Sequence, residues 1–179
     1  MLGDGNGWVR DPDGSRFWGR FGAAGLLALS PDESRVLLQH RAWWSHQGGT
    51  WALPGGARDS HESAADAALR EAFEETGLPP TSLEVLSEVV TARSQVGWTY
   101  TTVLARLVEP RELVPNEEST ALEWVPLDDA VAKVLSGEIV NATSVAGILA
   151  AAAAGGSTAG LRGVDAPWPD EPTALRNRR

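Results

Sequence analysis

The segment of residues 56–78 constrains this chain more than any other, because it has clear helix boundaries and is rich in carboxylates. Ser63, with Asp66 three residues later, has the spacing of a capping box, and Gly77 supplies a helix stop. The pattern predicts a helix from about Ala64 to Thr76. The apolar residues that recur at helical spacing are predicted to form its buried side: Ala65, Ala68, Leu69, Ala72 and Phe73.

Three carboxylates share one side of this predicted helix. Glu71, Glu74 and Glu75 fall at positions i, i+3 and i+4, where Cβ atoms are roughly 5–6 Å apart. Like charges this close repel, and Arg70 cannot neutralise all three together with Glu62. A hard cation can, since Mg²⁺ binds a few carboxylates and keeps water or phosphate oxygens in its other positions. An acidic run alone is more often a solvated helix face, so the choice between that and a metal site depends on the flanking residues.

The flanking residues complete a known motif. Residues 51–56 read Trp-Ala-Leu-Pro-Gly-Gly, and the glycines allow backbone carbonyls to approach a ligand or metal. Gly56, five residues, Glu62, seven residues and then Arg-Glu-Ala-Phe-Glu-Glu-Thr-Gly-Leu at 70–78 resemble the Nudix box of the Nudix hydrolases at every defining position. A chance match to its fixed identities is on the order of 10⁻⁸ per starting point.

The resemblance implies an α/β protein with the Nudix fold, an α/β/α sandwich with a mixed β-sheet and the box as a loop-helix-loop. We predict a flexible N-terminal arm at 1–16, a Nudix hydrolase domain at 17–155 and an irregular tail at 156–179. Hydrophobic patterning predicts strands at 17–29 and 35–41, joined by a hairpin turn, and at 83–93, 98–108 and 122–125, with helices from about 127 and over 142–154.

The resemblance also implies a reaction, the metal-dependent hydrolysis of a phosphoanhydride in a nucleoside diphosphate linked to another group. It assigns the metal ligands, for Mg²⁺ or alternatively Mn²⁺, to Glu71, Glu74, Glu75 and the Gly55 or Gly56 carbonyl. Arg70 and Glu62 would orient these carboxylates. The general base stays open among Glu71, Glu74 and Glu118, because family members differ.

Glu118 lies in an acidic loop six residues before Trp124. An acidic residue in the corresponding loop of several Nudix hydrolases adds a metal ligand or the general base, and a solvated loop is the alternative. Substrate contacts are predicted more weakly, and packing of the sheet competes with that role at most of these positions. The residues concerned are Arg41, Trp43, Trp44, Arg93, Trp98 and Tyr100.

Composition excludes some functions. The chain has no cysteine, which removes disulfides, thiolate catalysis and zinc–cysteine sites. A net charge of -9 argues against a nucleic-acid polymer as partner, since such binding relies on basic residues that neutralise phosphates. We expect a cytoplasmic protein, monomeric or homodimeric, that does not bind membranes and acts on a small nucleotide.

The sequence leaves the substrate open. The first expectation is a nucleoside triphosphate, including an oxidised one, cleaved to nucleoside monophosphate and pyrophosphate, because the short chain looks MutT-like. The alternative is an ADP-ribose or nucleotide-sugar pyrophosphatase. A non-catalytic nucleotide-sensing Nudix domain is the alternative of another class, although such domains commonly lose part of the carboxylate set. An isopentenyl diphosphate isomerase is disfavoured, because the expected cysteine is absent.

Overall fold

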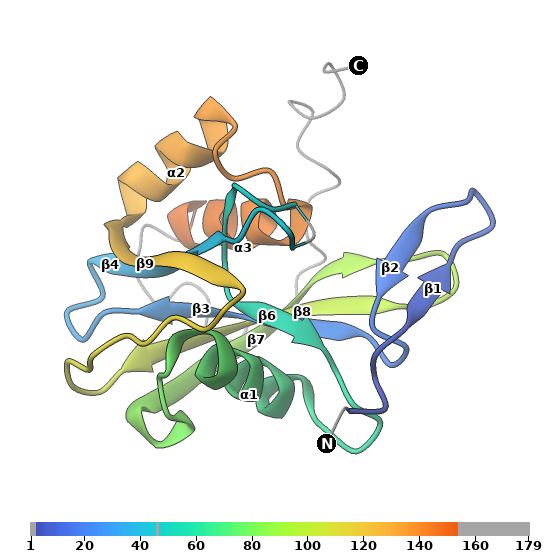
Figure 1. The fold of residues 1–179 in the computed structure, drawn as a ribbon, viewed down its shortest axis with the longest axis horizontal. Coiled ribbons are helices and arrows are strands. Elements are labelled where there is room, and N and C mark those ends of the chain that lie inside the picture. Colours follow the sequence, from blue (N-terminus) through green and yellow to red (C-terminus); the bar gives the residue numbers. More distant parts are fainter. Residues whose placement is uncertain (1–2, 46, 154–179) are drawn as a thin grey trace.

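A mixed β-sheet between two helical layers forms the body of the protein, as seen in a computed structural model that describes residues 3–45 and 47–153 (Figure 1). Helix α1 covers one face of this sheet, and α2 and α3 cover the other. The sheet contains β3 (Ala23–Leu29), β4 (Arg35–Arg41), β5 (Trp51–Ala52), β6 (Gly55–Ala57), β7 (Leu83–Arg93), β8 (Thr99–Leu107) and β9 (Ser119–Pro126). The helices are α1 (Ala64–Thr76), α2 (Leu127–Ser136) and α3 (Ala142–Ala153), with a 3₁₀ turn at Pro80–Ser82. The predicted sandwich is therefore confirmed, whereas the predicted tail at 156–179 lies outside the described residues.

Strand β3 is the central strand, and every residue in it is buried. It pairs in parallel with β8 along its whole length, while β6 pairs antiparallel with residues 23–25. Both of its faces are covered, which explains why it reads as a continuous apolar run rather than an alternating one. This arrangement places β6, and with it the start of the box, directly against the middle of the sheet.

Alternate side chains of the sheet build two cores. Leu26, Leu37 and Val103 pack with Ala68 and Ala72 of α1 on one face. On the other face, the core joins strand residues to both covering helices: Leu27, Leu38 and Leu104 with Ala130 of α2 and Ile148 of α3. Because alanine side chains are short, α1 can lie close to the sheet and hold the box carboxylates near the strand ends.

The boundaries of α1 agree with the sequence prediction. Ser63 accepts a hydrogen bond from the Asp66 amide, and the Asp66 side chain accepts one from the Ser63 amide in return. Gly77 ends the helix with φ 75°, and its N–H donates to the Phe73 carbonyl. The predicted burial of Phe73 is wrong, since this side chain is 50% exposed and the buried positions near this end of the helix are Glu75 and Thr76.

The predicted hairpin between residues 17–29 and 35–41 is only partly formed. β3 and β4 pair antiparallel, but the register holds only Leu29 against Val36. Farther along, β6 occupies the edge of β3, and β5 pairs with residues 39–40 of β4. The other edge of β4 pairs along its whole length with β9. Long-range pairing thus replaces the local hairpin, which periodicity alone does not reveal.

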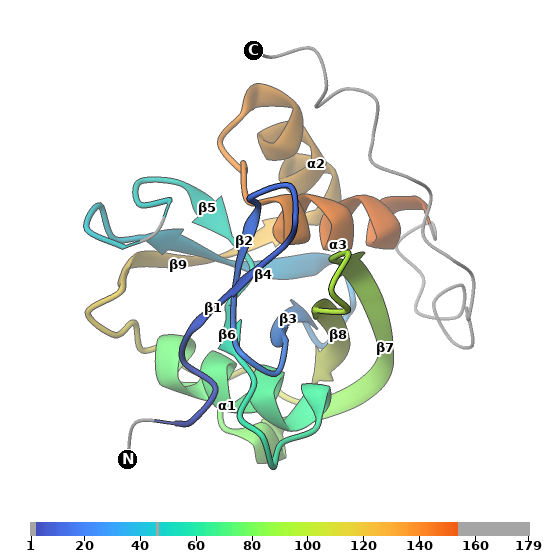
Figure 2. The same cartoon turned by 90° about the vertical axis from the view of Figure 1, so that its right-hand side faces the viewer.

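Residues 3–16 belong to the segment predicted to be a flexible N-terminal arm, and the structure gives them regular secondary structure and contacts to the body. β1 (Trp8–Arg10) and β2 (Arg16–Trp18) form a two-stranded sheet that stands beside the body in Figure 1 and crosses in front of it in Figure 2. Phe17 stacks on Trp98 at 4.8 Å between ring centroids, and the Trp98 indole N–H donates to the Gly19 carbonyl. These contacts attach the β1–β2 hairpin to the chain just before β8.

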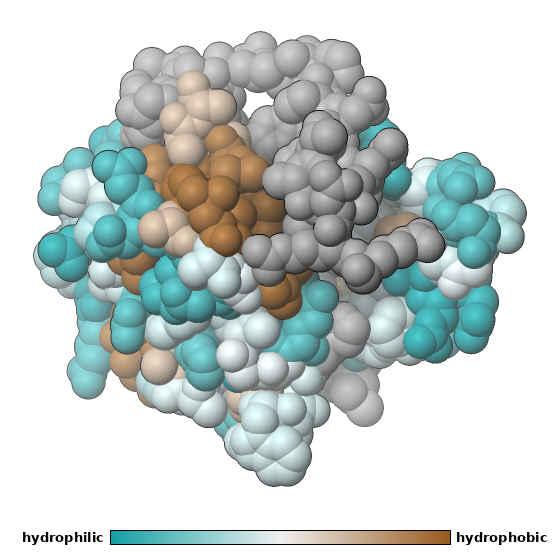
Figure 3. All heavy atoms as spheres, turned by 90° about the horizontal axis from the view of Figure 1, so that it is seen from above, coloured by the Kyte–Doolittle hydropathy of each residue, from teal (hydrophilic) through white to brown (hydrophobic). Residues whose placement is uncertain are grey.

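Apolar side chains also reach the surface on the face that carries α2 and α3 (Figure 3). Leu135 of α2 is 73% exposed and Val140, just ahead of α3, is 44% exposed.

None of the helices in the described part of the chain combines the length and the apolar character needed to cross a bilayer.

Candidate active site

Arg70 joins helix α1 to the loop in front of it. Its guanidinium donates to both carboxylate oxygens of Glu62, at 2.6 and 2.9 Å, and to the Ala57 carbonyl at 3.0 Å. It also donates to Glu71 at 2.8 Å and lies 3.6 Å from Glu74. The hydrogen bonds from Arg70 hold the pKa of Glu62 below its ordinary value. The structure thus brings together the residues that the sequence assigned to orienting the carboxylates.

The three glutamates of the box differ sharply in exposure. Glu75 is only 4% exposed, and its Oε2 accepts a hydrogen bond of 2.8 Å from the Gly55 N–H. Glu71 is held from one side by Arg70, with 18% of its side chain exposed. The Glu74 side chain is 54% exposed. The set therefore runs from a buried carboxylate beneath the helix to one that faces solvent.

Burial and mutual repulsion disfavour the ionised forms of two of these groups. Desolvation, followed by the charge of Glu71, raises the pKa of Glu75 to about 8, against the opposing effects of the Gly55 N–H and Arg41. Desolvation also raises the pKa of Glu71, although Arg70 acts in the opposite direction. Hard oxygen donors with this much unbalanced negative charge fit a divalent cation, which would stabilise the ionised carboxylates.

A pH dependence of stability follows from Glu75. Because its pKa rises from an ordinary 4.5 to about 8 on folding, ionisation opposes folding. The cost is absent below about pH 4.5 and complete above about pH 8. In chelator, the free energy of unfolding should fall across this window by about 5 kcal/mol more in the wild type than in Glu75→Gln. Denaturant melts at several pH values test this, with Glu88→Gln, an exposed site on β7, as control. Parallel curves for wild type and Glu75→Gln would contradict it.

Gly55 and Gly56 allow close approach, as the sequence predicts, but Gly55 makes room for the backbone of β3 and Gly56 for a side chain of the box. Gly55 pairs with Gly25, and its N–H is used by Glu75. A Cβ added at Gly56 would lie 2.5 Å from Cδ of Glu71 and 2.6 Å from both of its oxygens. Glycine is therefore required at position 56 for Glu71 to occupy its place. Metal binding by either glycine carbonyl stays a prediction.

Gly56→Ala should consequently displace the Glu71 carboxylate while leaving the fold intact. The clash involves the far end of a flexible side chain, so the free energy of unfolding should change by less than about 1 kcal/mol. The hydrolysis rate should fall about tenfold, because small displacements of reacting groups are costly. Steady-state kinetics and denaturant melts check both parts. Unchanged kcat in Gly56→Ala would show that the position of Glu71 is unimportant.

Glu118 lies in an exposed loop that the chain pins near α1. Its N–H donates to the Asn116 side chain at 2.9 Å, and its carbonyl accepts from the Ala42 N–H at 2.8 Å. The Glu118 charge contributes to the raised pKa values of Glu71 and Glu75, as expected for a carboxylate nearby. The structure thus places Glu118 beside the box glutamates, and its role as ligand or base stays a prediction.

Several predicted substrate contacts border the same region. The Arg41 charge acts on both Glu75 and Tyr100. Trp43 and Trp44 are 79% and 58% exposed, with their rings 5.5 Å apart in a T-shaped arrangement. Tyr100 is only 8% exposed, and burial raises its pKa to about 12. The two tryptophans therefore offer open aromatic surface, whereas Tyr100 is largely enclosed.

Two other predicted substrate contacts lie elsewhere. The Trp98 ring stacks on Phe17, and its indole N–H is bonded to Gly19, so this residue supports the N-terminal hairpin. Arg93 is exposed at the end of β7, opposite Thr99. The structure brings neither side chain into contact with the box glutamates. The local sequence did not reveal the neighbours of Trp98, because Phe17 and Gly19 lie far away in the chain.

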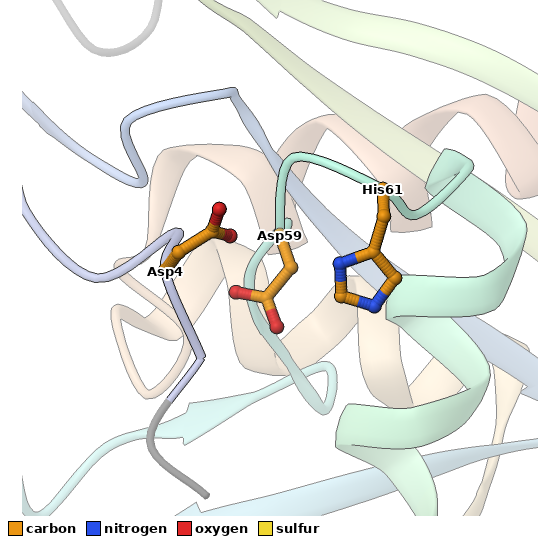
Figure 4. Close-up of side chains that lie close together, drawn as sticks. All are labelled: Asp4, Asp59 and His61. Atoms are coloured by element: carbon orange, nitrogen blue, oxygen red, sulfur yellow. The ribbon is translucent and has the colours of Figure 1, made fainter.

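A second acidic group, which the sequence analysis did not identify, lies at the loop before α1. One ligand atom each from Asp4, Asp59 and His61 lies within 4.8 Å of the others (Figure 4). Both carboxylates already hold the N-terminal segment, since Asp4 accepts from Ser60 at 2.6 and 2.9 Å and Asp59 accepts from the Gly5 N–H at 2.7 Å. We interpret this group as the attachment of the N-terminus to the box loop.

The chain is similar to known proteins in both sequence and structure. The family model of the NUDIX domain matches residues 19–144. A solved Nudix hydrolase from M. smegmatis, RenU, is 50% identical, with a TM-score of 0.72 over 83% of this chain and 94% of that one.

Two proteins of Mycobacterium tuberculosis are also similar. "Putative 8-oxo-dGTP diphosphatase 3" is 55% identical over 132 residues, which cover 70% of this chain and 61% of that protein. An ADP-ribose pyrophosphatase is 32% identical over 163 residues, 89% of this chain and 78% of that protein. The chain spans about three fifths of the length of the first relative.

Proposed function

This chain belongs to the Nudix family, and we propose that it is a pyrophosphohydrolase that cleaves an oxidised purine nucleoside triphosphate, such as 8-oxo-dGTP, to the monophosphate and pyrophosphate. The observation that carries the proposal is the Arg70 network, which fixes Glu62 and Glu71 while Glu74 stays open to solvent. An intact carboxylate set is what a hydrolase needs and a sensor does not. The 55% identical relative supports the choice of substrate.

In the proposed site, Glu71, Glu74 and Glu75 hold Mg²⁺, or Mn²⁺ in its place, and Arg70 fixes the orientation of Glu71. The cation would supply charge neutralisation for the phosphates and acidify a water. Glu118 is proposed to bind the metal or accept a proton. Arg41 would attract phosphate oxygens, and the exposed rings of Trp43 and Trp44 would stack a base.

A second candidate substrate is ADP-ribose. The specific observation in its favour is that the similarity to an ADP-ribose pyrophosphatase extends over 89% of this chain, beyond the family-model match. The N-terminal segment, which the structure attaches to the loop before α1 through Asp4 and Asp59, supplies the kind of extension that this activity would require. The oligomeric state, monomer or homodimer, stays a prediction, and so does the cytoplasmic location.

Product analysis decides between these activities. The purified chain is incubated with 8-oxo-dGTP, dGTP, ADP-ribose and a nucleotide sugar, with Mg²⁺, with Mn²⁺ and with chelator. Monophosphate plus pyrophosphate from 8-oxo-dGTP, lost in chelator, is the expected result. AMP plus ribose 5-phosphate from ADP-ribose would establish the second candidate. Nucleotide binding without turnover of any substrate would overturn both and support a sensor.

A further inference from the structure

The loop that carries Glu118 is tied to helix α1 at two backbone positions. The Val114 N–H donates to the Thr76 carbonyl at 2.8 Å. The Ser119 hydroxyl lies 3.4 Å from the Glu75 carbonyl, which it reaches as a donor. Both carbonyls belong to the last turn of α1, where carbonyls have no partner within the helix. The loop therefore completes the end of the helix that carries the box glutamates.

The Ser119 hydroxyl is itself hydrogen-bonded to a buried side-chain amide. Gln39 of β4 is completely buried, and its Nε2 donates to the Ser119 hydroxyl at 2.8 Å. Within the described part of the chain, the amide carbonyl of Gln39 has no hydrogen-bond partner. A buried polar atom without a partner costs about 1–3 kcal/mol, so a leucine here would serve the core at least as well. The position therefore holds a glutamine despite this cost.

We propose that Gln39 and Ser119 are positioning residues for the hydrolysis, because together they fix the Glu118 loop against the carbonyl of Glu75. The Ser119 hydroxyl oxygen accepts from Gln39, so its one proton is left for donation, which the Glu75 carbonyl at 3.4 Å and Oδ1 of Asn116 at 3.3 Å can both accept. Since Ser119 follows Glu118 directly, this contact sets how far the Glu118 carboxylate stands from Glu71 and Glu75. The inference rests on the proposed function for its kinetic part alone.

Other contacts hold the backbone of the loop, so Gln39 and Ser119 are needed only for its attachment to β4 and α1. Asn116 receives the Glu118 N–H, and Ala42 donates to the Glu118 carbonyl, so the Glu118 backbone is held from both sides. The Ser119 hydroxyl also lies 3.3 Å from Oδ1 of Asn116. Without Gln39 and Ser119, the two bonds to the Glu118 backbone would remain, but the loop would lose its side-chain attachment to β4 and to the last turn of α1.

The test compares Gln39→Leu and Ser119→Ala with Thr120→Ala. Thr120 is a matched control, since its hydroxyl bonds to His40 on the same pair of strands without contacting α1. With 8-oxo-dGTP and Mg²⁺, we expect Gln39→Leu and Ser119→Ala each to lower kcat about tenfold with KM within twofold. Thr120→Ala should be unchanged. In a Glu118→Gln background, neither change should lower kcat further.

Amide hydrogen exchange supplies a readout that does not depend on turnover. The Val114 amide, which donates to the Thr76 carbonyl at the end of α1, should exchange faster in Gln39→Leu and Ser119→Ala than in the wild type or Thr120→Ala. Unchanged exchange would overturn the inference even if the protein were inactive on every substrate. With an active protein, independent multiplication of the Ser119→Ala and Glu118→Gln effects, or full activity of Glu118→Gln, would overturn it while the proposed function stands.

Discussion

Glu74→Gln is expected to lower kcat for 8-oxo-dGTP with Mg²⁺ by about 10³-fold while leaving the fold intact. The reason lies in its surroundings. The Glu74 side chain is 54% exposed, and its nearest cation is Arg70 at 3.6 Å, so little of the fold depends on it. Glutamine has the same shape but no charge, so the substitution removes a metal ligand of the proposed site and little else. Steady-state kinetics and a thermal melt measure the two effects.

The comparison with Glu88→Gln makes this result interpretable. Glu88 is an exposed residue of β7, so the same chemical change there should leave kcat and the melting temperature as in the wild type. Full Mg²⁺-dependent activity in Glu74→Gln would show that the site is wrongly assigned. A loss of activity accompanied by unfolding is not expected, because Glu74 contributes no buried contact.

The sequence predicted the local part of this structure well. Ser63, Asp66 and Gly77 signal the two ends of α1 through contacts within a few residues, and these signals do not depend on the rest of the fold. Arg70 and Glu62, which the resemblance assigned to orienting the carboxylates, lie in hydrogen-bond contact although they are eight residues apart, and their orienting role stays a prediction.

Features set by distant residues were not predictable in this way. Helical spacing grouped the three glutamates, but only the approach of β6, with its Gly55 N–H, makes Glu75 a buried carboxylate. Phe73 was assigned to the core because of its apolar side chain, yet the sheet meets α1 through small alanines. The role of Gln39 depends on Ser119, 80 residues later, and nothing in the local pattern indicates it.

Arg70→Lys should be nearly as damaging as the loss of a metal ligand, even though it keeps the charge. The Arg70 guanidinium makes four hydrogen bonds at once, to Ala57, to both oxygens of Glu62 and to Glu71. A lysine ammonium has three donors at a single nitrogen and cannot reproduce this planar, divergent set. We expect kcat to fall about 10²-fold and the free energy of unfolding to fall by about 2 kcal/mol.

Arg58→Lys is the matched control for this substitution. Arg58 lies in the loop that Arg70 joins to α1, and its half-buried side chain donates a hydrogen bond of 2.9 Å to the Phe21 carbonyl but none to the box glutamates, so its replacement should have little effect on kcat or stability. If Arg70 acted only through its positive charge, Arg70→Lys would retain wild-type kcat, and the orienting role would be refuted. If it orients Glu71 through its fixed geometry, Arg70→Lys should also abolish the kinetic effect of Gly56→Ala, because both changes release the same carboxylate.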